Sequence, residues 1–131
     1  MGYSLDSNIV IALMAGNPAV RSRIVAQQPG SIFMSTIVLH ELMFGAFNSQ
    51  RTQVNLERLE KLAFPLLLFD DADARAAGEV RATLKRLGTP IGTLDALIAG
   101  QARARNLVVV TANYREFERV EGLTVEDWTA A

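Results

Sequence analysis

Three acidic side chains occupy positions where an acid facing solvent is not expected. Asp6 directly follows a short apolar segment, where a strand pattern changes into a helix pattern. Glu41 has apolar residues or glycine three and four positions away on both sides, and Asp95 is the only polar residue from Leu94 to Gly100. Burying a carboxylate without a partner costs several kcal/mol, so we expect a metal ion or an arginine to meet these groups.

Each of these acids also has a purely structural interpretation. Asp6 and Asp95 lie at the starts of predicted helices, where the helix dipole favours a negative charge. Glu41 could instead form a structural salt bridge with a basic side chain. The residue types alone leave both interpretations open.

A further polar cluster follows the apolar run 107–110. Thr111, Asn113, Glu116 and Glu118 lie within eight residues, although each alone would suit a turn or the surface. In an open parallel sheet, ligands bind outside the carboxyl ends of the strands. Asp6 and the segment 111–116 lie at such ends, and Glu41 and Asp95 lie on helices that could reach the same edge.

The available donors favour a metal ion that binds oxygen. The chain has no cysteine and one histidine, which excludes zinc–thiolate and iron–sulfur sites, disulfides and a thiol nucleophile. Carboxylates suit Mg²⁺ or Mn²⁺, ions that activate water and stabilise phosphoryl oxygens. The histidine, His40, neighbours Glu41 but points about 100° away around a helix, so we do not expect it to be a ligand.

Several other function classes lack their motifs. The sequence contains no glycine-rich phosphate loop, no G-x-G-x-x-G after the first strand and no G-x-S-x-G elbow. The formal net charge of −1 lacks the basic excess of a typical nucleic-acid binder. If four acids gather at one metal site, however, the rest of the chain is basic on balance. Arg81 and Lys85 could then contact phosphate, although a solvated helix face is the simpler interpretation.

Apolar runs alternate with helical patterns along all 131 residues, which predicts one α/β domain over residues 1–131. We expect a mostly parallel sheet of four or five strands, flanked by about seven helices. Ser7, Ser35 or Thr36, and Thr93 are the predicted helix caps, and Pro65 predicts a sheet edge. The predicted strands cover 3–5, 32–34, 64–69, 107–110 and 123–125, and the predicted helices cover 8–14, 18–28, 36–48, 52–62, 71–87, 94–105 and 114–118.

No targeting signal or membrane span is evident. The first basic residue is Arg21, and Asp6 interrupts the apolar run at the N-terminus, so no secretory signal is expected. No apolar stretch approaches the roughly 18 residues of a membrane span. We therefore expect a soluble, cytoplasmic protein.

Four segments, spread in order along the chain, resemble the PIN-domain ribonucleases, and within them the VapC-type toxins of bacterial type II toxin–antitoxin pairs. The resemblance implies an acidic site that binds one or two Mg²⁺ or Mn²⁺ ions and hydrolyses RNA phosphodiester bonds. The matching segments are Leu5–Asn8, Ser35–Leu42, Gly88–Ala99 and Val110–Phe117, the last continuing through Gly122–Trp128.

The resemblance also assigns roles to individual residues. Asp6, Glu41 and Asp95 stand at three family carboxylates, and Glu116 is the predicted fourth, so these four are the predicted catalytic and metal-binding residues. Many relatives have an aspartate near Asn113 instead. The predicted substrate contacts are Ser7, Thr111, Asn113 and Arg115.

The resemblance implies two kinds of protein partner besides RNA. One is a small antitoxin whose C-terminal segment covers the acidic site with an arginine, and the other is a second copy of the chain. The assembly expected with the antitoxin is a heterotetramer or larger. Two other functions stay open, a non-catalytic PIN-like module that binds RNA or protein and a metal phosphatase. Faces with Phe44, Phe47, Leu56 and Leu59 could be shared between the core and an interface.

Overall fold

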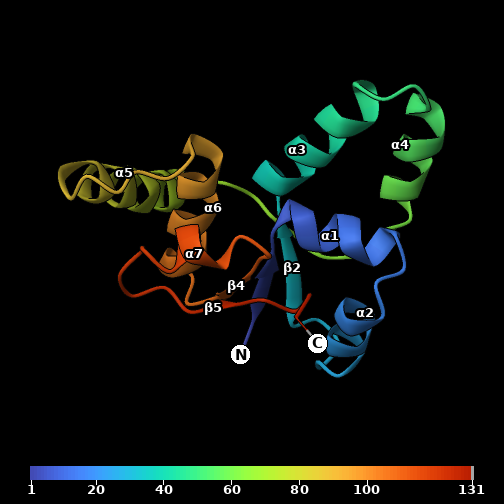
Figure 1. Cartoon of the computed structure of the whole chain (residues 1–131), viewed down its shortest axis with the longest axis horizontal. Helices are drawn as coiled ribbons and strands as arrows, with labels where there is room; N and C mark the ends of the chain where they lie inside the picture. The colour runs from blue at the N-terminus through green and yellow to red at the C-terminus, as the bar shows by residue number, and fades with distance from the viewer. Residues whose placement is uncertain (131) are drawn as a thin grey trace.

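Five short strands form one parallel sheet in the computed structural model, which describes residues 1–130 (Figure 1). The strand order is β3-β2-β1-β4-β5, so the first strand lies at the centre. Tyr3 is paired with Ile32 on one side and with Val108 on the other. The strands are β1 (Tyr3–Leu5), β2 (Ile32–Ser35), β3 (Leu66–Leu67), β4 (Val108–Val110) and β5 (Val125–Glu126).

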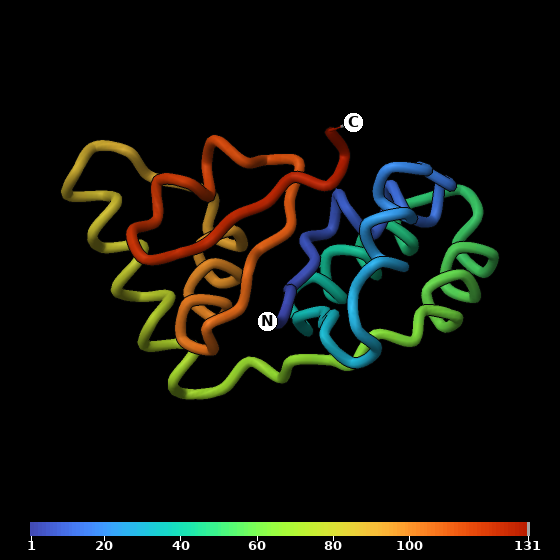
Figure 2. Tube along the Cα trace, turned by 90° about the horizontal axis from the view of Figure 1, so that it is seen from below, coloured from blue at the N-terminus to red at the C-terminus, as the bar shows by residue number. Residues whose placement is uncertain are grey.

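Seven helices connect and cover these strands within the described chain. In Figures 1 and 2, α1 to α4 gather on one side of β1 and α5 to α7 on the other. None of the helices within residues 1–130 is both long enough and apolar enough to cross a bilayer. The helices are α1 (Ser7–Met14), α2 (Pro18–Val25), α3 (Thr36–Phe47), α4 (Thr52–Glu60), α5 (Asp71–Arg86), α6 (Thr93–Ala104) and α7 (Tyr114–Phe117).

The predicted α/β fold with a parallel sheet is therefore confirmed, with differences at the ends of elements. The strand predicted over 64–69 pairs with β2 only at Leu66 and Leu67, after which the chain leaves the sheet toward α5. It is an edge strand, as Pro65 predicted. The last strand begins at Val125, later than predicted, because Val125 and Glu126 are the residues that pair with β4.

Two predicted helix caps are wrong. Asp6 rather than Ser7 caps α1, since Asp6 has the extended backbone of an N-cap and its Oδ1 accepts from the Ser7 amide at 2.8 Å. Thr93 is the first helical residue of α6, and Gly92 precedes it without a side-chain cap. The prediction for α3 is confirmed at Ser35, whose hydroxyl accepts from the Ile37 amide.

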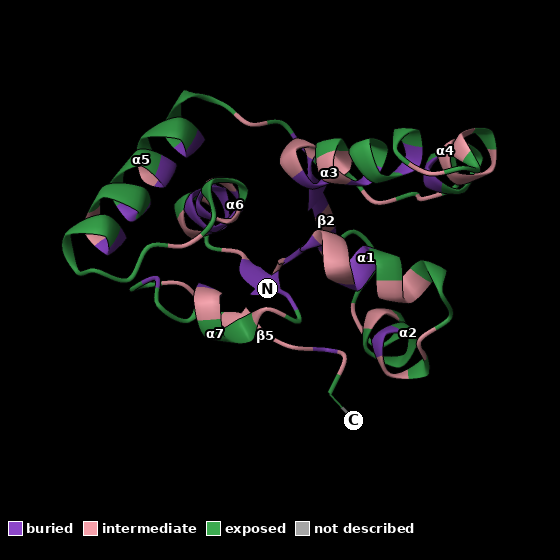
Figure 3. Ribbon diagram, turned by 45° about the horizontal axis from the view of Figure 1, so that its top comes forward, coloured by how far each residue is buried: buried purple, intermediate pink, exposed green. Residues whose placement is uncertain are grey.

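The core lies along β1 and β4 and between them and the helices. Val108, Val109 and Val110 are all buried, as expected for a strand covered on both faces. Trp128 and Phe117 are the largest fully buried side chains. Figure 3 shows the buried faces of α5 and α6 turned toward each other.

A buried acid that the sequence pattern did not single out links α5 to α6. Asp73 on α5 is only 1% exposed and accepts hydrogen bonds from Gln101 and from the Arg105 guanidinium. Asp73 and Arg105 also form an ion pair, with 2.8 Å between Asp73 Oδ2 and Arg105 Nη2. Burial opposes ionisation of Asp73, but these bonds and the Asp70 amide outweigh it and lower its pKa to about 2. Asp73 therefore serves the packing of α5 on α6.

Candidate active site

The four predicted carboxylates come from four separate elements and lie in one neighbourhood. Asp6 follows β1, Glu41 lies on α3, Asp95 lies in the first turn of α6 and Glu116 lies on α7. Their charges act on one another, because Asp6 raises the pKa of both Glu41 and Asp95, and Glu116 and Glu41 raise the pKa of Asp95. The C-terminal ends of the central strands are what bring Asp6 and the β4–α7 connection together.

Asp6 is held by three hydrogen-bond donors. Its Oδ1 accepts from the Ser7 amide, and its Oδ2 accepts from the Thr111 hydroxyl at 2.7 Å and from the Asn8 side chain at 3.2 Å. Asp6 is 3% exposed, and this burial raises its pKa although the hydrogen bonds lower it. The carboxylate therefore has one fixed orientation in a region of low dielectric.

Glu41 has a buried oxygen with no hydrogen-bond partner. Its Oε1 is shielded from solvent and unpaired, and none of the ion pairs formed among residues 1–130 involves Glu41. Burial and the charge of Asp6 raise the pKa of Glu41, while His40 lowers it. The structural salt bridge considered for Glu41 is therefore not formed within the described chain.

Asp95 has the most perturbed ionisation of the four carboxylates. Burial is the largest cause, followed by the charges of Asp6, Glu116 and Glu41 and by a hydrogen bond with the Glu116 carboxyl, and together they raise the pKa of Asp95 to about 7. Glu116 is itself held by Asn113, whose side-chain amide donates to Glu116 Oε2 at 3.0 Å. Near neutral pH, Asp95 therefore shares a proton with its neighbours or needs a cation.

The four predicted substrate contacts differ in their access to solvent. Arg115 is exposed on α7, and Ser7 and Asn113 are half-buried. Thr111 is fully buried, and its hydroxyl faces Asp6 rather than solvent. Among the candidates, Ser7, Asn113 and Arg115 are thus the ones that a bound molecule could reach.

Asn8 is a residue of this site that sequence reasoning did not single out. Its amide contacts both Asp6 and the segment after β4. The available signal was its place two residues after Asp6, at the start of a largely apolar helix.

The donor set fits a divalent cation that prefers oxygen, although it is not preassembled. No three acidic or histidine side chains within residues 1–130 stand close enough together to form a ready-made metal cluster. Asp6, Glu41 and Asp95 nevertheless all have raised pKa values, and Glu41 presents an unpaired buried oxygen. Mutual repulsion of this kind is relieved when a cation is bound.

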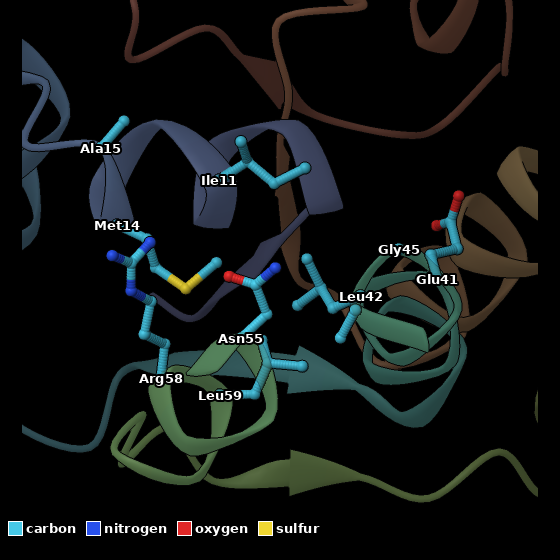
Figure 4. Close-up of a pocket in the computed structure, with 10 residues that line it drawn as sticks. Ile11, Met14, Ala15, Glu41, Leu42, Gly45, Asn55, Arg58 and Leu59 are labelled. Atoms are coloured by element: carbon cyan, nitrogen blue, oxygen red, sulfur yellow. The ribbon is translucent and has the colours of Figure 1, made fainter. Parts of the chain in front are cut away.

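An apolar groove lies beside the acidic site, between α1, α3 and α4. Its volume is about 370 Å³, and Ile11, Leu42 and Leu59 are among the residues that line it. Figure 4 shows Glu41 and Arg58 toward opposite ends of the groove, with the Glu41 carboxylate turned away from Arg58. The groove therefore extends from Glu41 on α3 to the exposed Arg58 on α4.

Residues 3–123 match the PIN domain. The chain belongs to the PIN-domain family. Within this family it groups with VapC proteins. It is 44% identical over 130 residues to the tRNA(fMet)-specific endonuclease VapC of Shigella flexneri, and this alignment covers 97% of this chain and 98% of that protein. It is 36% identical over 128 residues to ribonuclease VapC2 of Haemophilus influenzae, over 96% of this chain and 97% of that protein.

Solved structures of VapBC proteins share the fold over nearly the whole chain. DNA-bound VapBC from Salmonella typhimurium aligns with a TM-score of 0.91 at 39% identity and covers 98% of each chain. VapBC-1 from nontypeable Haemophilus influenzae aligns with a TM-score of 0.89 at 36% identity, over 98% of this chain and 99% of that chain. The resemblance to VapC-type PIN domains is therefore confirmed, whereas the roles of individual site residues stay predictions.

Proposed function

We propose that this PIN-domain protein is a Mg²⁺- or Mn²⁺-dependent endoribonuclease and the growth-inhibiting toxin of a toxin–antitoxin pair. The observation that carries the proposal is the convergence of Asp6, Glu41, Asp95 and Glu116, with an unpaired buried oxygen on Glu41 and a pKa of about 7 on Asp95. Such a cluster is costly unless a cation balances it. Relatives that are named as an endonuclease and a ribonuclease add independent support.

The four carboxylates divide into holding and supporting roles. Asp6 and Asp95 would hold the principal ion, and Glu41 and Glu116 would complete its ligands or hold a second ion. A divalent cation held there would supply positive charge against the oxygens of the scissile phosphate and acidify an attacking water. Asp95 would have to lose its proton to hold a cation, so binding would become weaker as the pH falls below about 7.

Other residues would hold these groups or reach the substrate. Thr111 donates to Asp6, and Asn113 donates to Glu116, so both fix the orientation of a carboxylate. Ser7, Asn113 and Arg115 are the proposed RNA contacts, and Arg115 would pair with a phosphate. Initiator tRNA is the first substrate to test, because a relative at 44% identity is named for cleaving it.

Two protein partners complete the proposal. The structural neighbours are VapBC complexes, and an antitoxin with a basic side chain would complement four clustered carboxylates. A second copy of the chain would cover the exposed aromatic side chains of Phe44 and Phe47 on α3, giving a homodimer and a heterotetramer or larger complex with the antitoxin. The proposed place of action is the cytoplasm, where the RNA substrate and the antitoxin are made.

A cleavage assay with matched variants tests the enzyme. Purified protein with Mg²⁺ or Mn²⁺ is expected to cut initiator tRNA at defined positions, mapped by sequencing the 5′ ends of the fragments, and EDTA is expected to stop the reaction. Asp95→Asn should lower the rate at least 100-fold, because it removes one charge from the site while keeping its shape. Glu118→Gln is the control, since Glu118 is an exposed acid two residues after Glu116.

Three outcomes would contradict the proposal. Cleavage that is insensitive to EDTA, or equal in Asp95→Asn and wild type, would rule out the carboxylate site. RNA binding without cleavage would favour the non-catalytic PIN-like module. Turnover of a chromogenic phosphomonoester without any cleavage of RNA would favour a phosphatase.

A further inference from the structure

The side chain of Asn8 bridges two segments that lie more than a hundred residues apart in the sequence. Asn8 lies in the first turn of α1, and its Nδ2 donates to Asp6 Oδ2 at 3.2 Å and to Thr111 Oγ1 at 3.3 Å. Its Oδ1 accepts from the Ala112 backbone amide at 2.9 Å. Both ends of one amide group are therefore used, one toward Asp6 and one toward the chain after β4.

The chemistry of these partners determines which way the amide points. A backbone N–H only donates, so the oxygen of Asn8 must face Ala112, and the nitrogen then faces the Asp6 carboxylate, which only accepts when ionised. A carboxylate at position 8 could still accept from Ala112 but would repel Asp6. An alanine would make neither bond.

The bridge continues from Ala112 to Glu116. The next residue, Asn113, donates its backbone amide to Thr111 Oγ1 at 2.9 Å and its side-chain amide to Glu116 Oε2 at 3.0 Å. Ala112 itself is exposed, and its backbone amide is bonded to the side chain of Asn8 at the start of α1. A contiguous set of hydrogen bonds thus runs from Asp6 through Asn8, the Thr111 hydroxyl and Asn113 to Glu116.

We infer that Asn8 is a positioning residue that sets the Asp6 carboxylate and the Glu116 segment in one geometry for cleavage. This inference rests on the proposed ribonuclease function, but the bridge itself can be tested without RNA. Asn8 acts through Asp6 and Ala112 and need not touch the substrate, so its loss should lower kcat and leave KM for RNA nearly unchanged.

Two variants separate the two ends of the amide. Asn8→Ala removes all three hydrogen bonds of the side chain, so the Ala112 amide should exchange with deuterium at least tenfold faster in NMR spectra. We also expect kcat to fall at least tenfold, with KM changed less than threefold. Asn8→Asp keeps the acceptor for Ala112, so that amide should stay protected while kcat still falls at least tenfold. Asn48→Ala, at an exposed asparagine that follows α3, is the control and should change neither quantity.

The outcomes distinguish this inference from the proposed function. If wild-type protein cuts RNA and Asn8→Ala retains kcat within twofold, the inference is wrong and the ribonuclease proposal stands. If Asn8→Ala leaves the exchange of the Ala112 amide unchanged, the bridge is overturned whatever the activity. If wild-type protein does not cut RNA, the ribonuclease proposal fails, and the Ala112 exchange still decides whether Asn8 holds this connection.

Discussion

Asp95 shows at the scale of one residue how burial and neighbouring charges change the ionisation of an acid. It lies at the start of α6, where the helix dipole favours a negative charge, yet its pKa is raised to about 7. Burial and three neighbouring carboxylates therefore outweigh the helix terminus. The structural interpretation of Asp95 as an acid that stabilises its helix explains its position but not its ionisation.

This shift predicts how the metal-free protein responds to pH. An acid whose pKa is raised on folding stabilises the folded state below its unfolded pKa of about 4, and this stability is lost as the pH rises toward about 7. In EDTA, the free energy of unfolding should thus fall by roughly 2 kcal/mol between pH 5 and pH 7. Asp73, with a pKa of about 2, loses its contribution only between about pH 4 and pH 2 and does not affect this range.

Urea unfolding at several pH values measures this effect. Asp95→Asn should remove most of the slope and be more stable than wild type at pH 7 in EDTA, because the asparagine carries no charge to be repelled. Added Mg²⁺ or Mn²⁺ should stabilise wild type and not the variant. A flat pH profile in wild type, or the same slope in both proteins, would show that the carboxylates do not repel one another as described.

At the scale of elements, the close contact of α5 and α6 determines where Asp95 lies. A Cβ atom added to Gly100 would come within 2.4 Å of the backbone of Ala77, so the two helices touch backbone to backbone at this point. Asp73, Gln101 and Arg105 hold the same pair of helices at the next turn. The carboxylate at the other end of α6 is therefore positioned by contacts well away from the site.

Gly100→Ala should separate these helices. Because the new methyl group meets backbone rather than a flexible side chain, we expect a loss of roughly 1–3 kcal/mol in the free energy of unfolding. We also expect a lower rate of RNA cleavage, since α6 carries Asp95. Gly78→Ala is the matched control, because a Cβ there meets nothing within 4 Å, and it should stabilise α5 by up to about 1 kcal/mol. Equal stability of the two variants would contradict the close approach.

At the scale of the whole molecule, the net charge of −1 divides unequally between the four carboxylates that act on one another and the rest of the chain. The chain carries 13 basic and 14 acidic residues, and four of the acids lie in one site. The rest of the chain, with 13 basic and 10 acidic residues, is therefore basic on balance, which is compatible with an RNA substrate despite the net charge of −1. The exposed Arg115 lies on the same helix as Glu116.

The molecule as a whole also has an exposed aromatic surface on α3. The Phe44 side chain is 64% exposed and Phe47 is 65% exposed, whereas Leu59 on α4 is buried in the core. Leu56 is half-buried and packs against the core, so the two phenylalanines are the ones of these four residues left for an interface. Large exposed aromatic groups on adjacent turns of a helix are typical of a protein–protein contact.

A double variant tests the proposed homodimer. Phe44→Lys with Phe47→Lys should convert a dimer into a monomer in analytical ultracentrifugation at micromolar concentration, since two desolvated charges would oppose association. Val25→Lys, at an exposed apolar residue on α2, should leave the dimer intact. A monomeric wild-type protein, or a double variant that remains dimeric, would contradict this role of the α3 surface.

The sequence by itself determined the class of fold and which acids are candidates for a site. Carboxylates in apolar surroundings identify Asp6, Glu41 and Asp95, because an unpaired buried acid is too costly to occur without a function or a partner. The alternation of short apolar runs with helices predicts a parallel sheet, since parallel strands need crossover connections. These inferences depend on local spacing and on residue type, both of which can be read from a single chain.

Only the tertiary structure decided which groups meet. Asn8 and Ala112, Asp73 and Arg105, and Gly100 and Ala77 are pairs from distant segments, and nothing in the local pattern of either partner indicates the other. Likewise, only the structure shows that Glu41 forms no salt bridge among residues 1–130, whereas the buried Asp73 forms one with Arg105. Hydrogen bonds and close packing depend on distances of a few ångströms, which are set by how the elements pack rather than by their order.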